Sequence, residues 1–271
     1  MHGIGSPDLL GGVVSVQLRQ VCLVARELGP VIEDLTAILG VKVCHVDPGV
    51  ARFGVENALL GVGKNFLEVV APLREQTAAG RYLDRRNGDG GYMVITQADT
   101  LANQQAIRQR ALDREIRIAF EREHRGGRLC QLHPGDLIAA FLEVDYEPQE
   151  DFEGNWTAAG GIGWKDAVRQ DVTLDFLGVE LQAPDPGALA ALWGGVIGAA
   201  VSQHGSEAQL TLNNAYLRFV QATDGRGAGL SGLEVAVKDR GHILAEAERR
   251  DCLVSEDQVE LCGTTFHLQD A

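Results

Sequence analysis

The sequence predicts an α+β fold built from a repeated unit of one strand, one helix and further strands. The apolar runs LRQVCLVAREL (18–28) and GGYMVITQAD (90–99) each precede a stretch with helical spacing. Each unit then closes on a strand that contains Phe-Leu-Glu-Val, namely NFLEVVAP (65–72) and AAFLEVDYEP (139–148). Gln20 precedes Glu68 by 48 residues and Tyr92 precedes Glu143 by 51, so one supersecondary unit occurs twice in tandem.

The first unit consists, in order, of a strand, a helix and three strands. Pro30 stands in the first turn of a helix at 30–39, where apolar residues follow helical spacing. Gly40 ends this helix, and Pro72 stops the last strand. The expected strands of this unit lie at 14–25, 42–46, 51–62 and 65–71.

A connector and a second unit follow. The connector includes a short helix that ends at Arg85 and Arg86, followed by a Gly-rich turn, and the Gly pairs at 90–91 and 126–127 are typical of turns. The second unit has a helix at 99–112 and strands at 91–97, 115–121, 128–133 and 137–146. A polar linker follows, and its Trp156 and Trp164 are expected to anchor it against a domain.

The rest of the chain has two further units in diverged form. Their strands and helices are expected at 175–185, 186–198, 215–223, 232–239, 240–250 and 260–270. Their opening strands carry Gly178 and Gly232, and their closing strands offer Arg218 and either Phe266 or His267. Because these residues do not make a metal set, we expect this half to supply packing, an interface or a wall of the site.

Charge and composition exclude several classes of function. The formal net charge is −14 and the isoelectric point is near 4.9, which argues against nucleic-acid and anionic-membrane surfaces. No run approaches 18 apolar residues, and the first residues lack the pattern of a signal peptide. The five scattered cysteines include no CxxC pair, so we expect reduced thiols in a cytoplasmic protein.

The repeat resembles the vicinal oxygen chelate superfamily, which includes glyoxalase I, methylmalonyl-CoA epimerase, bleomycin-resistance proteins and type I extradiol dioxygenases. In that superfamily each module is βαβββ, and its opening strand has His seven residues before Asp. Here Gln20 stands seven residues before Glu27, and Tyr92 stands seven before Asp99. The connector RYLDRRNGDGGYMVI (81–95) is similar to the segment that introduces the second module in glyoxalases and epimerases.

The resemblance implies tandem βαβββ modules paired into glyoxalase-like domains, with mixed curved sheets and flanking helices. A first domain would span 1–148, with modules at 14–73 and 88–148. A linker would span 149–172, and a second, divergent domain would span 173–271.

The resemblance also implies a metal site of Gln20, Glu68 and Glu143, with Tyr92 at or beside the fourth position. An oxygen-rich set suits hard or borderline divalent ions such as Zn, Ni, Mn, Co or Mg. The ion would act as electrophile while Glu143 or Glu68 moves a proton, as in a lyase or isomerase acting on a small oxygenated substrate. An extradiol dioxygenase is less favoured, because it needs an iron site of two His and one carboxylate.

The sequence departs from the family pattern where the second opening strand should bring His. It has Tyr92 followed by Met93, and the connector leaves open which of them takes that position. A metal-free interpretation therefore stays open, in which the two glutamates accept hydrogen bonds in the pocket of a binding or resistance protein. Two ionised carboxylates that face one cavity repel each other, which favours a cation or a cationic ligand. A scaffold or oligomerisation module is a third hypothesis.

Two further residues are candidates for substrate binding. His133, in QLHPG, is either a polar turn residue or a base or ligand near Glu143. Arg86 belongs to a basic cluster that forms either a solvated helix face or a seat for a substrate phosphate or carboxylate. We expect a small-molecule substrate as partner and no nucleic acid or membrane, and a homodimer stays open.

Overall fold

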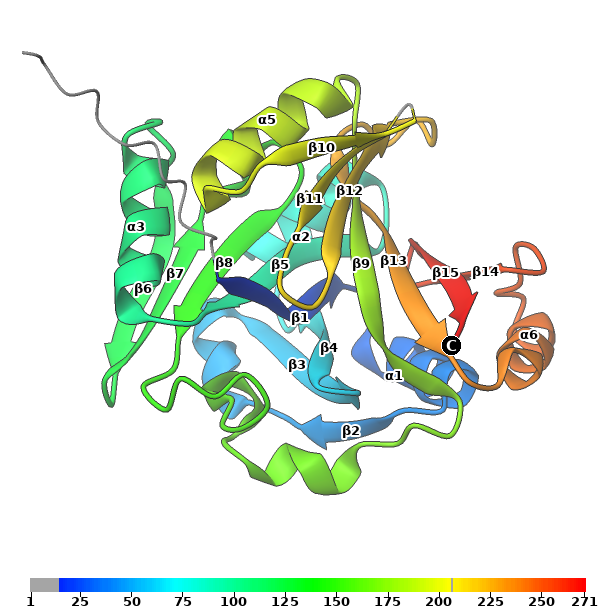
Figure 1. Cartoon of the computed structure of the whole chain (residues 1–271). Coiled ribbons are helices and arrows are strands. Elements are labelled where there is room, and N and C mark those ends of the chain that lie inside the picture. Colours follow the sequence, from blue (N-terminus) through cyan, green and yellow to red (C-terminus); the bar gives the residue numbers. More distant parts are fainter. Residues whose placement is uncertain (1–14, 206) are drawn as a thin grey trace, which may run out of the picture.

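The computed structural model describes residues 15–205 and 207–271, and it has two mixed β-sheets with flanking helices (Figure 1). The first sheet has the order β2-β3-β4-β1-β5-β8-β7-β6, with strands Val16–Val24 (β1), Lys42–His45 (β2), Val55–Val62 (β3), Asn65–Pro72 (β4), Gly90–Ala98 (β5), Ile118–His124 (β6), Gly127–Leu132 (β7) and Phe141–Tyr146 (β8). The second has the order β10-β11-β12-β9-β13-β15-β14, with strands Thr173–Ala183 (β9), Val201–His204 (β10), Glu207–Thr211 (β11), Tyr216–Gln221 (β12), Gly229–Val237 (β13), Gln258–Leu261 (β14) and Thr264–Asp270 (β15).

The helices connect strands within the modules and between them. The α-helices are Leu28–Leu39 (α1), Ala78–Arg86 (α2), Leu101–Leu112 (α3), Pro134–Leu137 (α4), Pro186–Ile197 (α5) and Arg240–Arg249 (α6). The 3₁₀ helices are Pro48–Phe53 (η1), Thr157–Ala159 (η2) and Gly163–Ala167 (η3).

Each sheet consists of two modules that meet at its centre. In the first, β1 pairs antiparallel with β5, while β1 and β4, and likewise β5 and β8, pair in parallel. The second repeats this arrangement with β9 and β13 at its centre. The predicted fold of tandem βαβββ modules paired into glyoxalase-like domains is therefore confirmed. The fourth module is reduced, since a single bridge between Leu253 and Val259 replaces its first strand after the helix.

Local chemistry explains where the elements differ from the predicted boundaries. The expected strand at 51–62 begins only at Val55, because Asp47 accepts a hydrogen bond from the Gly49 amide and starts η1 instead. The strand expected at 137–146 begins at Phe141, because Pro134 opens the short helix α4. Gly90 and Gly91, expected in a turn, are the first residues of β5.

One hydrophobic core joins the two sheets, because successive side chains of the central strands point to opposite faces and one face of each sheet is apolar. On β1, Val21 and Leu23 point into this core, whereas the neighbouring Cys22 and Val24 belong to a smaller cluster on the opposite face. The larger core also takes residues of β9, β13 and helices α1, α3, α5 and α6. Helix α1 packs against α6, and α3 packs against α5.

A close approach between the sheets depends on a glycine. A Cβ at Gly91 would lie 2.3 Å from Leu230 Cδ2 and 2.6 Å from the Leu230 carbonyl oxygen. Because part of this neighbour is backbone, it cannot simply rotate away. Gly91 thus lets β5 cross close to β13.

We therefore expect Gly91→Ala to lower the free energy of unfolding by about 1 to 3 kcal/mol, since the added methyl overpacks the core. Urea unfolding monitored by circular dichroism measures the effect. Gly29→Ala is the control, because a Cβ there meets nothing within 4 Å and a helical alanine is favoured. A loss no greater in Gly91→Ala than in Gly29→Ala would contradict the close approach.

The linker between β8 and β9 (residues 147–172) is fixed to the first sheet by buried aromatic rings. Trp156 stacks on Phe66 with ring centroids 6.5 Å apart, and Trp164 meets the same ring edge-on at 5.0 Å. The guanidinium of Arg19, fully buried, lies 5.3 to 5.5 Å from the centroids of all three rings and donates to linker carbonyls. The expected anchoring role of both tryptophans agrees with these contacts.

Candidate functional site

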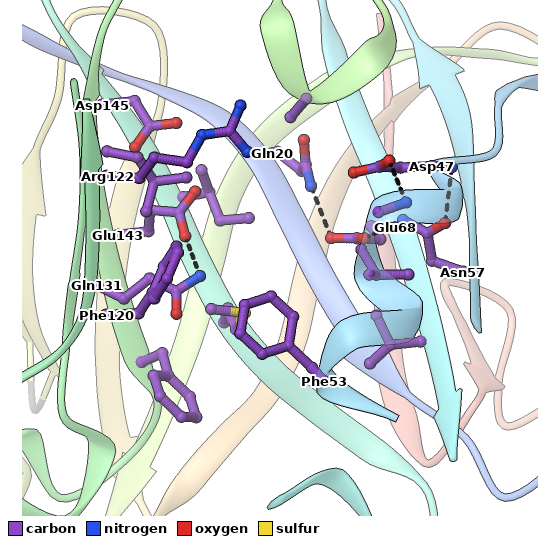
Figure 2. A pocket seen from close by; sticks show the side chains of 18 of the residues that line it. Gln20, Asp47, Phe53, Asn57, Glu68, Phe120, Arg122, Gln131, Glu143 and Asp145 are labelled. Carbon is purple, nitrogen blue, oxygen red and sulfur yellow. Dashed lines mark hydrogen bonds between the residues drawn. The ribbon is translucent and has the colours of Figure 1, made fainter. Parts of the chain in front are cut away.

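A cavity of about 640 Å³ lies on the face of the first sheet that is opposite the shared core (Figure 2). Residues of the first module form one wall and residues of the second module form the other. Six residues singled out in the sequence line it, namely Gln20, Glu68, Tyr92, Met93, His133 and Glu143. The repeat thus brings these side chains together from strands far apart in sequence.

Strand register decides which residue corresponds to Gln20 in the second module. Gln20 pairs with the phenylalanine that stands two residues before Glu68. Met93 pairs with the phenylalanine that stands two residues before Glu143. Met93 is therefore the counterpart of Gln20, and its thioether takes the place at which the sequence pattern suggested Tyr92.

Tyr92 lies in a β-bulge and forms part of the cavity wall. On β1, Cys22 pairs with Met93 and the next residue pairs with Gly91, so Tyr92 has no partner in this strand pairing. Both Tyr92 and Met93 therefore reach the cavity. Its ring packs edge-on against Tyr82 at 4.9 Å and Phe141 at 5.1 Å. Burial raises the pKa of the Tyr92 phenol above its usual range, so the side chain stays neutral.

Two side-chain amides hold the carboxylate of Glu68. Gln20 Nε2 donates to Oε2 at 2.8 Å, and Asn57 Nδ2 donates to Oε1 at 2.6 Å. The amide oxygens are also engaged, because Gln20 Oε1 accepts from the Trp156 indole at 2.8 Å and Asn57 Oδ1 accepts from the Asp47 backbone amide at 2.9 Å. An indole N–H only donates, so Trp156 fixes the orientation in which Gln20 turns its NH₂ toward Glu68.

Glu143 is less fully satisfied than Glu68. It is 3% exposed and accepts one hydrogen bond, at 2.5 Å from Gln131 Nε2. Burial raises the pKa of Glu143 to about 7, with Gln131 opposing the shift and the negative charge of Glu68 adding to it. The pKa of Asp145, on the same face of β8, is raised well above its usual range by burial and by Glu143.

The donor set does not fit the divalent ion that the sequence analysis placed at Gln20, Glu68 and Glu143. Gln20 offers its NH₂ rather than its oxygen, and an amide NH₂ does not bind a metal ion. Both oxygens of Glu68 are hydrogen-bonded, and the fourth position carries the thioether of Met93, a soft group. Across residues 15–205 and 207–271, no three His, Cys, Asp or Glu are grouped in a way that could hold an ion.

His133 and Arg86 have different surroundings. His133 lines the cavity, where its Nδ1 accepts from the Gly135 amide at 3.1 Å and caps α4. Arg86 does not line the cavity, because its guanidinium donates to the carbonyls of Arg226, Gly227 and Ala228 before β13. Arg86 therefore connects α2 to the segment that precedes β13 of the second sheet.

Several residues that line or support the site were not singled out as site residues from the sequence, among them Asn57, Gln131, Asp145 and Trp156. Asp145 could have been found, because strand alternation places it on the same face as Glu143. Asn57 and Gln131 lie on strands that lack the repeated phrase, and Trp156 comes from the linker, so no spacing rule connects them to the carboxylates.

The second sheet carries a charged network at the corresponding positions. Arg218 occupies the place of Glu68, and its guanidinium forms ion pairs with Glu180 at 2.7 Å, Glu234 at 2.9 Å and Glu207 at 3.3 Å. His267 occupies the place of Glu143, with its ring 3.5 Å from Glu180. These groups engage one another, so the second sheet does not reproduce the arrangement of the first.

Comparison with known proteins supports the fold alone. No family model and no curated protein sequence matches the chain. A hypothetical protein from Staphylococcus aureus has a TM-score of 0.62 and 9% identity, over 94% of this chain and 99% of that one. A methylmalonyl-CoA epimerase in complex with methylmalonyl-CoA and NH₄⁺ has a TM-score of 0.43 and 23% identity, over 51% of this chain and 99% of that one. The methylmalonyl-CoA epimerase from Mycobacterium tuberculosis has a TM-score of 0.41 and 24% identity, over 49% of this chain and 89% of that one.

The match to the Staphylococcus aureus protein extends over both sheets. The arrangement of two such sheets in one chain is therefore not peculiar to this protein. In the part of the chain that the structure describes, no helix is long and apolar enough to cross a bilayer.

The raised pKa of Glu143 predicts a pH dependence of stability. A carboxyl group whose folded pKa lies near 7, above its ordinary 4.5, stabilises the fold below pH 4.5 and loses that contribution as pH rises to about 7. We expect the unfolding free energy of the wild type to fall between pH 5 and pH 8 by about 1 to 3 kcal/mol relative to that of Glu143→Gln. Urea unfolding at both pH values measures this difference.

Glu121→Gln is the matched control, since Glu121 is half exposed and Arg108 lowers the pKa of its carboxyl. The pH dependence of its unfolding free energy should be close to that of the wild type, with a small difference opposite in sign to that of Glu143→Gln. Equal pH dependence in Glu143→Gln and the wild type would contradict the shift.

Proposed function

We propose that the cleft of the first sheet binds a small oxygenated molecule and moves a proton on it without a metal ion. The protein would then be a glyoxalase-like isomerase or lyase of the vicinal oxygen chelate superfamily. One observation carries this proposal: two carboxylates, Glu68 and Glu143, occupy equivalent positions on pseudo-symmetric strands and line one cavity. Carboxylates placed in this way can reach a bound carbon atom from two sides.

The different surroundings of the two carboxylates support different roles. Glu143, with one amide donor and a pKa near 7, can both take up and release a proton at neutral pH. Glu68 has a donor on each oxygen, and these amides stabilise its ionised form against the effect of burial. We therefore assign proton exchange to Glu143 and a charged partner role to Glu68.

Binding without catalysis is the second candidate, of the ligand-sequestering kind. It is favoured by the closed network around Glu68, in which Gln20, Asn57 and Trp156 engage one another before any ligand arrives. Such a network rigidifies a pocket as well as it positions a base.

Elemental analysis tests whether the site works without a metal. We expect protein purified without chelator or metal-affinity resin to contain far less than one divalent ion per chain, since Gln20 and Asn57 present NH₂ groups to Glu68. Added Mn²⁺, Ni²⁺ or Zn²⁺ should bind no better to the wild type than to Glu68→Gln/Glu143→Gln. About one ion per chain, lost in the double variant, would refute metal independence.

Hydrogen–deuterium exchange into substrates tests the proton transfer. We expect the protein in D₂O to accelerate exchange at the carbon next to a carbonyl, in dicarbonyl adducts or epimerisable thioesters followed by NMR. Glu143→Gln should lower the rate by about 100-fold or more, because it removes the general base. Some ligands could bind the wild type, as seen by thermal shift, and yet exchange deuterium no faster with it than with Glu143→Gln. That result would favour a ligand-sequestering protein.

A further inference from the structure

Strand β8 places carboxylates side by side along one buried face. Glu143 and Asp145 lie two residues apart on this strand, and Glu147 follows directly after its end. Side chains two residues apart point to the same face, and their Cα atoms are about 6.6 Å apart. Their exposed fractions are 3%, 8% and 6%, and all three line the cavity. We refer to Glu143, Asp145 and Glu147 as the β8 acidic row.

Asp145, the middle residue of the acidic row, lacks an N–H hydrogen-bond donor on one of its oxygens among the described residues. Glu147 accepts from Asn155 Nδ2 at 2.9 Å and from the Thr157 amide at 2.7 Å, both in the linker. Glu143 accepts from Gln131, and its carboxyl group also lies within hydrogen-bonding reach of that of Asp145. No N–H group within the described residues donates to the buried Oδ1 of Asp145. Burying a carboxylate without a donor is costly, so this oxygen marks the place of a missing donor.

Within the described part of the chain, the acidic row has no ion pair, although the buried guanidinium of Arg19 interacts with Glu147 at longer range. None of its three carboxylates forms an ion pair with Lys, Arg or His in residues 15–205 and 207–271. Arg122 lines the same wall, beside Asp145 in Figure 2, but it makes no ion pair with it. Burial disfavours the ionised form of these carboxyl groups, and a positive ligand beside them would favour that form again.

Aromatic and apolar groups line another part of the cavity, whose lining also includes Arg52, Arg122 and Arg128. The rings of Phe53 and Phe120 lie edge-on at 5.3 Å, and Met93 and Phe141 contribute further apolar surface. The guanidinium of Arg52 lies 4.6 Å from the Phe53 centroid and 5.2 Å from that of Phe120, so this ring pair already accommodates a cation. The cavity thus combines an acidic end with aromatic surface.

We propose that the cavity binds an organic cation, with an ammonium or guanidinium head at Asp145 and Glu143 and an apolar body against Phe53 and Phe120. Several N–H donors on one head can satisfy both carboxylates, and a volume of about 640 Å³ suits a molecule with an apolar body of several carbons. This inference rests on the proposed small-molecule site and names the class of its ligand.

Calorimetric titration of the full chain with matched probes tests the inference. The cationic probes are 4-phenylbutylamine, 4-phenylbutylguanidine and trimethyl(4-phenylbutyl)ammonium, and the comparison probes are 4-phenylbutanol and 5-phenylpentanoate. We expect at least one of the first two cations, which carry N–H donors, to bind at least about tenfold more tightly than both comparison probes, since only these cations pair with the carboxylates. Failure of all three cations to bind at millimolar concentration, or equal binding of the alcohol, would overturn the proposal.

Variants assign the head group to the acidic row. Asp145→Asn should weaken the best cation at least about tenfold while leaving 4-phenylbutanol unchanged, because the amide keeps the volume but not the charge. Glu121→Gln, which removes a carboxylate outside the cavity lining, should bind like the wild type. If Asp145→Asn does not fold, Glu143→Gln replaces it with the same expectation. Unchanged cation binding in the folded variant would overturn the assignment.

The outcome separates this inference from the proposed proton transfer. Cation binding that depends on Asp145, without accelerated deuterium exchange, would support the ligand class and refute catalysis. Exchange on neutral carbonyl compounds without any cation binding would support catalysis and refute the ligand class.

Discussion

The antiparallel pairing of β1 with β5 is the contact on which the rest of the structure depends. It joins the first two modules, and its register makes Gln20 and Met93 equivalent while each closing strand adds a carboxylate beside them. Because side chains alternate along a strand, the same pairing sends Val21 and Val94 into the core shared with the second sheet. One register thus positions both the cavity and the contact between the sheets.

The linker is part of the site as well as a connection. Arg19 fixes it with a fully buried guanidinium, which donates to linker carbonyls and lies against aromatic rings. Trp156 then orients Gln20, and Gln20 donates to Glu68. The hydrogen-bonding state of a carboxylate on β4 therefore depends on a segment that lies more than 80 residues later in the chain.

The two sheets balance buried charge in different ways. On the second sheet, Arg218 stands within an arrangement of glutamates and supplies the positive charge that they require. On the first, amides stabilise Glu68, and the raised pKa values of Glu143 and Asp145 reduce their charge. Among the described residues, Glu143 and Asp145 on the first sheet therefore lack the ion pairs that Arg218 gives to the glutamates of the second.

The sequence alone determined the repeated module, the order of its elements and the residues Gln20, Glu68 and Glu143 that line one cavity. It could do so because strand alternation and the spacing of the Phe-Leu-Glu-Val strands are local properties of the chain. Only the tertiary structure decided that Met93 rather than Tyr92 matches Gln20, because a bulge shifts the register by one residue. It alone placed Arg86 against the carbonyls near β13 and turned the Gln20 amide toward Glu68. Arg86 meets these carbonyls, and Gln20 meets Trp156, only through folding.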